Sequence, residues 1–155
     1  MFKKLLVLAA LIATPTAAHA CDGRDLLMAK SQEAAQLAHK DHNEHGFVIY
    51  ELNGVCAASE IFTSNEAGHV SAQIPWKRGS HMLYFIHTHP NVGDDQTTMS
   101  DQDKDIVRGL EDKLGYEFTP GIVTNYGKVS YFLYEYKLLR SIEDFKIANT
   151  THISL

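Results

Sequence analysis

The segment 81–90 constrains this chain more than any other part of its sequence. It begins as an apolar run that predicts a buried strand, and it ends in His87-Thr88-His89-Pro90. Residues two apart on an extended chain point to the same face, so both imidazoles are expected on one side of the strand. Imidazole is a common Zn²⁺ ligand, and a catalytic zinc site takes three protein ligands and keeps a fourth position open. The segment therefore predicts a strand whose end supplies two metal ligands.

A carboxylate for the third ligand follows at Asp103, three residues after Ser100. These two residues begin a predicted helix over 100–114. They have a second interpretation, because serine is a favoured N-cap and an acidic side chain in the first turn suits the helix dipole. That interpretation explains both residues without a metal, and it is compatible with metal binding. His87 and His89 could likewise be surface residues at a strand end, but their combination with Asp103 favours a metal.

The first 20 residues are typical of a secretory signal peptide. They contain a basic start at Lys3 and Lys4, a short apolar run, and a small-x-small triplet that ends at Ala20. The apolar run is too short to span a bilayer as a helix. We expect residues 1–20 to be removed and residues 21–155 to form one periplasmic or secreted domain. Membrane contact is then limited to the signal peptide before cleavage.

Cys21 and Cys56 are the two cysteines of the chain. In an oxidising compartment a single pair most simply forms one disulfide. The alternative is a free or acylated Cys21 and a buried Cys56, although the residues before Cys21 match a lipoprotein signal poorly. Two cysteines without CxxC spacing do not make a thiol-rich zinc site.

Composition bounds the partners and the number of domains. The formal net charge is −5, and no stripe of lysine and arginine is present, which argues against nucleic acid as a partner. The sequence shows no internal repeat, low-complexity tract or Pro/Gly-rich linker, so a single domain is expected.

The remaining segments predict helices and strands that intermingle. We expect a helix over 24–39 with Asp22 as its N-cap, strands over 46–52, 55–62, 118–124 and 128–135, and a short helix over 141–148 before a frayed tail. Asn53-Gly54 predicts a two-residue hairpin turn between the first two strands. Three histidines near the end of the first helix (His39, His42 and His45) are expected on the surface. The fold class is α/β, with a mixed, largely antiparallel sheet flanked by helices.

The pattern His87-Thr88-His89-Pro90, then Ser100-x-x-Asp103, resembles the signature of the JAMM (JAB/MPN-type) zinc metallopeptidases, H-[ST]-H-P followed by S-x-x-D. More narrowly, the chain is similar to bacterial JAB-like domains of uncharacterised function. The resemblance covers about residues 24–135. It implies a JAB/MPN-like fold with a cytidine-deaminase-like architecture.

The resemblance also implies a role for each matching residue. His87, His89 and Asp103 would bind Zn²⁺. Glu44, in a segment similar to the family's glutamate-plus-glycine motif, would act as the general base and pass a proton to the leaving amine. Ser100 would donate a hydrogen bond to the developing oxyanion. The implied reaction is hydrolysis of an amide or isopeptide bond in a peptide or protein substrate.

Two questions stay open at this point. Glu51 and Glu60 are further candidates for the base; Glu44 is favoured because Gly46 follows it and because it begins the strand, yet it could also be a solvated linker residue. A second hypothesis is a non-catalytic JAB-like binding module with a structural zinc. In that module a fourth protein ligand, such as His42 or Asp94, would close the metal site.

Overall fold

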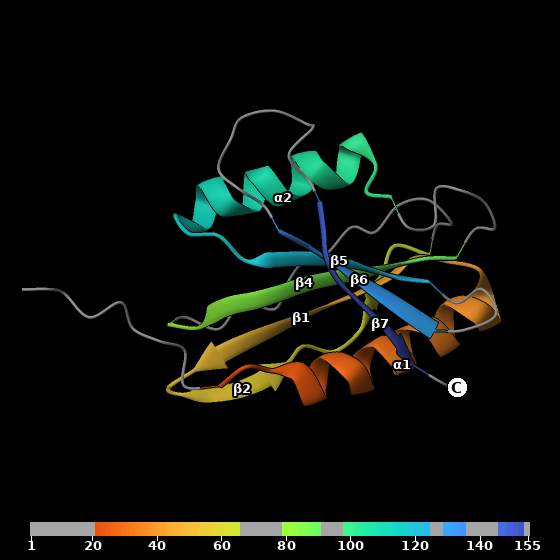
Figure 1. Ribbon diagram of the computed structural model, residues 1–155, viewed down its shortest axis with the longest axis horizontal. Helices are drawn as coiled ribbons and strands as arrows, with labels where there is room; N and C mark the ends of the chain where they lie inside the picture. Colours follow the sequence, from red (N-terminus) through yellow and green to blue (C-terminus); the bar gives the residue numbers. More distant parts are fainter. Residues whose placement is uncertain (1–20, 66–78, 91–97, 125–128, 136–145, 154–155) are drawn as a thin grey trace, which may run out of the picture.

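Two helices pack on opposite faces of one mixed sheet (Figure 1). The computed structural model describes residues 21–65, 79–90, 98–124, 129–135 and 146–153, with side chains up to Thr124. The elements in chain order are α1 (Arg24–Asp41), β1 (His45–Leu52), β2 (Val55–Ala58), β3 (Phe62–Thr63), β4 (His81–His89), α2 (Asp101–Leu114), β5 (Thr119–Thr124), β6 (Val129–Glu135) and β7 (Lys146–Ile153). The expected signal peptide, 1–20, lies outside the described residues.

The sheet confirms the expected fold class. Its strand order is β2-β1-β4-β5-β6-β7, and β3 also pairs with β1. Strands β4 and β5 are parallel, and α2 makes the crossover between them. The other described pairs are antiparallel.

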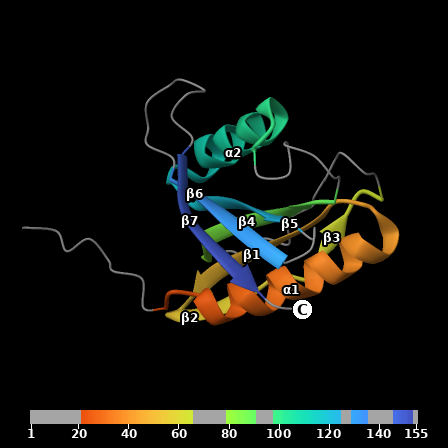
Figure 2. The same cartoon turned by 45° about the vertical axis from the view of Figure 1, so that its right-hand side comes forward.

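Alternating side chains of the central strands build a core on each face of the sheet. On the α1 face, Phe47 and Ile49 of β1 pack with small and aliphatic residues of α1. On the α2 face, Val48 and Tyr50 pack with residues that include Val107 of α2. Figure 2 shows the two helices on either side of the sheet. Because β1 is covered on both faces, its register against β4 is fixed by burial, and a one-residue slip would exchange the two cores.

The first hairpin agrees with the prediction at its turn and differs in its second strand. Asn53 and Gly54 both have positive φ, of 53° and 81°, as a type I′ turn requires. The expected strand over 55–62 is instead divided into β2 and β3. The division falls at Ser59, whose Oγ accepts a hydrogen bond from the Val48 amide at 3.0 Å in place of a backbone carbonyl.

The prediction for the C-terminal segment was wrong in its described part. Residues 146–153 form the strand β7 instead of the end of a helix and a frayed tail. Strand β7 pairs with β6 from Glu135↔Lys146 to Val129↔Ile153. This stretch contains several β-branched residues, which favour a strand once a partner offers its backbone groups. Residues 136–145 lie outside the described part of the chain.

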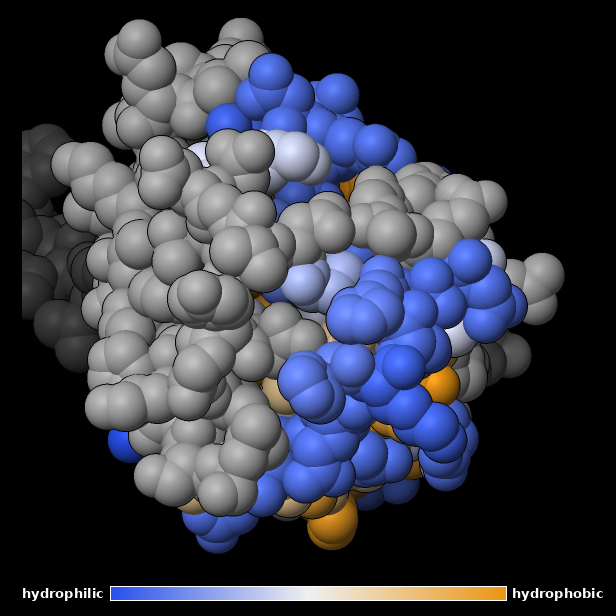
Figure 3. Space-filling model, turned by 90° about the vertical axis from the view of Figure 1, so that its right-hand side faces the viewer, coloured by the Kyte–Doolittle hydropathy of each residue, from blue (hydrophilic) through white to orange (hydrophobic). Residues whose placement is uncertain are grey.

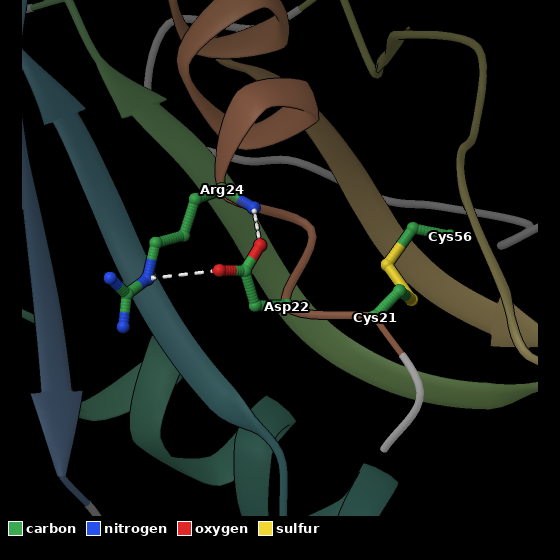
Figure 4. The surroundings of a disulfide bond; sticks show 4 residues. All are labelled: Cys21, Asp22, Arg24 and Cys56. Atoms are coloured by element: carbon green, nitrogen blue, oxygen red, sulfur yellow. Dashed lines mark hydrogen bonds and ion pairs between the residues drawn. A yellow bond between two sulfur atoms is a disulfide. The ribbon is translucent and has the colours of Figure 1, made fainter.

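The disulfide between Cys21 and Cys56 joins the residues before α1 to strand β2 (Figure 4). The two Cα atoms are 5.7 Å apart, which is usual for a disulfide. The N-cap of α1 is Gly23 instead of Asp22, although the Asp22 carboxylate accepts a hydrogen bond from the Arg24 amide at 3.1 Å. Gly23 has a φ of 67°, and a Cβ there would lie 2.8 Å from Ile49, so glycine suits both the conformation and the space.

The disulfide is consistent with an oxidising, extracytoplasmic location. Neither helix in the described part of the chain is long and apolar enough to cross a membrane.

Glu111 gives the fold a pH dependence that a substitution can test. Burial raises the pKa of this α2 carboxyl to about 7; a hydrogen bond from the Phe118 backbone opposes the shift, and the charges of Glu117 and Asp112 add to it. The folded state therefore holds a proton that the unfolded state releases near pH 4.5. Stability is highest below pH 4.5 with respect to this group and is lost as the pH rises through 7.

We expect Glu111→Gln, which keeps a similar shape and an acceptor oxygen, to be more stable than the unsubstituted protein above pH 7. The expected difference is about 1–2 kcal/mol after allowance for partial solvation, and it should vanish near pH 4.5. Urea unfolding from pH 4.5 to 8.5 measures it, with the exposed Glu33→Gln on α1 as the control. If the free energies of unfolding of Glu111→Gln and the unsubstituted protein differed by the same amount at every pH, the raised pKa of Glu111 would be contradicted.

Candidate metal centre

The end of β4 and the start of α2 bring three metal-binding side chains together. His87 and His89 lie on the α2 face of β4, where they point in the same direction as Phe85. Asp103 lies in the first turn of α2. Strand β4 extends to His89, so both histidines belong to the strand itself. The expected ligand set is therefore brought to one place, His87, His89 and Asp103.

The distances within this group suit a zinc ion. The Nε2 atoms of His87 and His89 are 2.9 Å apart, and they lie 3.3 and 3.6 Å from the Oδ1 and Oδ2 atoms of Asp103, respectively. Tetrahedral zinc with bonds of about 2.0–2.1 Å to nitrogen and oxygen places its ligand atoms about 3.3–3.4 Å apart. The three observed distances, 2.9, 3.3 and 3.6 Å, bracket that value. Small shifts of the imidazoles would admit the ion.

Burial differs among the three ligands in a way that leaves one side of the group accessible. The His87 side chain is 1% exposed, whereas those of His89 and Asp103 are 13% and 12% exposed. The buried Nδ1 atom of His87 has no hydrogen-bond partner among the described residues, so Nε2 is the atom directed at the other ligands. The group thus has a buried floor and a rim that reaches solvent.

The end of the molecule where β4 ends and α2 begins faces the viewer in Figure 3. The described residues exposed on this face are mostly hydrophilic, with small hydrophobic areas between them.

The electrostatics of the group keep the aspartate ionised. Burial alone would raise the pKa of Asp103, but hydrogen bonds with His87 and His89, the charge of His87 and a hydrogen bond from Ser100 outweigh it. The pKa of Asp103 is therefore held far below its usual range. An ionised carboxylate is the form that binds a divalent metal.

Ser100 confirms the capping interpretation. Its Oγ accepts a hydrogen bond from the Asp103 amide at 3.1 Å, and the Ser100 amide donates to Asp103 Oδ2 at 2.8 Å, which completes a capping box. The Ser100 hydroxyl also donates to Asp103 Oδ2 at 2.8 Å. The cap thereby orients the same carboxylate that faces the two histidines. Asp103 therefore belongs both to the N-terminal cap of α2 and to the candidate metal-binding group.

Glu44 lies directly before β1 and is buried, with 8% of its surface exposed, so it is not a solvated linker residue. The antiparallel register pairs Gly46 with His87. Continuing this register by two residues sets Glu44 opposite His89, and opposite residues of an antiparallel pair point to the same face. Gly46 itself is packed under the ring of Phe62, so closely that a Cβ would contact the ring carbons.

The two alternative glutamates lie elsewhere. Glu51 is five residues along β1 from Gly46, about 17 Å at the usual rise, and it pairs with His81 at the opposite end of β4 from His87. Glu60 is exposed and lies between β2 and β3.

His45 was expected on the surface and is instead buried. Its Nε2 lies 3.0 Å from both carboxylate oxygens of Asp41, the last residue of α1, and its amide donates to Thr88 Oγ1 at 2.9 Å. Sequence reasoning missed this set, although the i,i+4 spacing of Asp41 and His45 was a signal. His39 and His42 are exposed, as expected.

The candidates for a fourth ligand are not brought to the group in the described part of the chain. His42 is an exposed residue at the C-cap of α1, and Asp94 lies outside the described residues. Among the residues that the structure describes, the metal-binding group has three members.

Comparisons with known proteins identified no relative of this chain. No protein-family model matches the chain, and no curated protein and no solved structure is significantly similar to it.

Proposed function

We propose that this chain is an exported zinc metallopeptidase of the JAMM type that hydrolyses an amide or isopeptide bond. The observation that carries the proposal is the group of His87, His89 and Asp103, with zinc-like spacing and one accessible side. Three protein ligands are typical of catalytic zinc sites, whereas structural sites usually have four. The JAB/MPN-like fold is part of the same proposal, and the mixed sheet between two helices supports it.

The protein residues have distinct tasks in the proposed reaction. A zinc ion bound by this group would polarise the substrate carbonyl and lower the pKa of water to about 7. The Glu44 carboxylate would accept the proton of the attacking water and deliver it to the leaving amine, which is general acid–base catalysis. Glu44 is buried, and the register of β1 against β4 sets it opposite His89, which supports this role.

Ser100 would donate a hydrogen bond to the oxyanion that develops on the substrate. Its hydroxyl donates to Asp103 in the structure, so this role requires rotation of the hydroxyl away from the carboxylate. A cation bound to Asp103 would make its oxygen atoms weaker acceptors. The rotation would then be easier, and the hydrogen bond from the Ser100 amide would still orient the Asp103 carboxylate.

Glu44→Gln tests the proposal, because glutamine keeps the shape of the side chain and cannot carry the proton. We expect zinc content to be unchanged and the hydrolysis rate to fall by at least about a hundredfold, since general base catalysis contributes about 10²–10⁴. The assay measures amine release from a mixed pool of amide-linked and isopeptide-linked peptides by the zinc-loaded protein.

Glu51→Gln is the matched control, because Glu51 is a partly buried glutamate at the other end of the same strand. It should retain full activity. An equal rate for Glu44→Gln and the unsubstituted protein would exclude Glu44 as the base. A fully zinc-loaded protein that hydrolyses no member of the pool would favour the alternative, a non-catalytic binding module.

A further inference from the structure

Thr88 lies between the two metal-binding histidines and has a task of its own. Its side chain points to the face of β4 opposite to His87 and His89, by the alternation of the strand. Thr88 is 1% exposed, and its Oγ1 accepts a hydrogen bond from the His45 amide at 2.9 Å. A hydroxyl oxygen therefore takes the place of a ladder carbonyl where the pairing of β1 with β4 begins.

The side chain of His45 is also held, by Asp41. Its imidazole is buried, and its Nε2 lies 3.0 Å from both carboxylate oxygens of Asp41. Burial raises the pKa of Asp41, but a hydrogen bond from the Asn43 backbone and the interactions with His45 outweigh it and lower the pKa. A continuous series of contacts thus joins the end of α1, the start of β1 and the end of β4.

We propose that Thr88 and the Asp41–His45 pair are positioning residues that fix the Glu44 carboxylate relative to the metal-binding strand. This inference rests on the proposed function. Glu44 and His45 share a peptide bond, so the hydrogen bond from the His45 amide sets the height of Glu44 along β4. Glu44 directly precedes His45, the first residue of β1.

The expected effect is on the rate and not on metal binding. His87 and His89 point to the face of β4 opposite to the Thr88 hydroxyl, and Asp103 lies on α2, so loss of the Thr88 hydroxyl leaves the three metal-binding side chains in place. A displacement of the base by about 1 Å can reduce the rate by 10²-fold, because catalysis depends on near-attack geometry. A positioning residue acts through such displacements and never touches the substrate.

A pair of substitutions at one position tests the inference. Thr88→Val keeps the shape and removes the acceptor, whereas Thr88→Ser keeps the acceptor. We expect Thr88→Val to lower kcat about 10- to 100-fold, as loss of supporting hydrogen bonds commonly does in metal sites. Its zinc content should equal that of the unsubstituted protein. Thr88→Ser should restore kcat to nearly the original value.

Hydrogen exchange at the His45 amide gives a second readout that does not depend on hydrolysis. In the zinc-loaded protein, exchange should be faster in Thr88→Val than in Thr88→Ser or the unsubstituted chain. If the unsubstituted protein hydrolyses no peptide, the proposed function fails, and exchange still tests the link between Thr88 and His45. Faster exchange with an unchanged kcat would overturn the positioning role, and so would a loss of zinc from Thr88→Val.

Asp41→Asn keeps the inference testable if Thr88→Val does not fold, because Asp41 is at the end of α1 and partly exposed. It should lower kcat by several-fold at an unchanged KM and zinc content. The exposed Asp25→Asn, at the other end of α1, is the control and should have no effect. Equal kcat values for Asp41→Asn and Asp25→Asn would contradict a role for the Asp41–His45 pair.

Discussion

Replacement of His87 by alanine is expected to abolish stoichiometric zinc binding. The unsubstituted protein should bind about one zinc ion per chain, since three side chains that could hold a metal ion lie at distances close to those of tetrahedral zinc ligands. Loss of a supporting hydrogen bond alone lowers metal affinity by about 10- to 100-fold, so loss of a ligand should exceed that range. Elemental analysis after dialysis and competition with a chromogenic chelator measure the stoichiometry and the affinity.

Asp103→Asn separates the metal role of this residue from its capping role. The asparagine oxygen can still accept the hydrogen bond from the Ser100 amide, so α2 should keep its N-cap while metal affinity falls with the lost charge. His39→Ala and Asp101→Asn are matched controls, because both residues are exposed and outside the group. Retention of stoichiometric zinc by His87→Ala and Asp103→Asn would refute the site.

Reduction of the Cys21–Cys56 disulfide should destabilise the protein by about 4 kcal/mol in the chain-entropy model for a sequence separation of 35 residues. For a chain of this size the corresponding fall in Tm is roughly 10–15 °C. In the chain-entropy model the cause is the larger conformational entropy of the unfolded chain once the bond that closes the loop between Cys21 and Cys56 is broken. Thermal unfolding followed by circular dichroism, with and without a phosphine reductant, measures the change.

Zinc binding by the folded protein should survive this reduction. The reason is that the disulfide lies far from the candidate metal centre along the sheet. Cys56 pairs with Glu51, and Glu51 is about 17 Å along β1 from Gly46, the residue that pairs with His87. The double variant Cys21→Ser/Cys56→Ser is the control, and its Tm should be low and insensitive to the reductant. An equal response of the double variant and the unsubstituted protein to the reductant would show that the effect does not come from the disulfide.

The residues of the candidate metal centre could be predicted from the sequence because their geometry is local. His87 and His89 share a face through the two-residue period of a strand, and Ser100 and Asp103 define a helix start by their spacing. The pairing of two cysteines also left few alternatives. In each case a short-range rule sets the arrangement, and the fold has only to bring two such pieces together.

The errors came from long-range pairing. The segment 146–153 was expected to be helix and tail, yet it forms β7 because β6 offers a row of backbone groups. The strand expected over 55–62 is interrupted at Ser59, whose Oγ accepts a hydrogen bond from the Val48 amide. His45 is buried because Asp41 and Thr88 bind it from two different elements. No local pattern encodes which distant partner a backbone amide finds.

The sequence by itself thus predicted the candidate metal-binding residues, the N-cap of α2 and the α/β class, since these follow from periodicity and residue chemistry over a few positions. Only the tertiary structure decided that His87, His89 and Asp103 meet at zinc-like distances with one accessible side. It also separated Glu44 from Glu51 and Glu60, because the register of β1 against β4 sets which glutamate lies at the histidine end of the sheet. That register depends on the burial of β1 on both faces, which is a property of the assembled core.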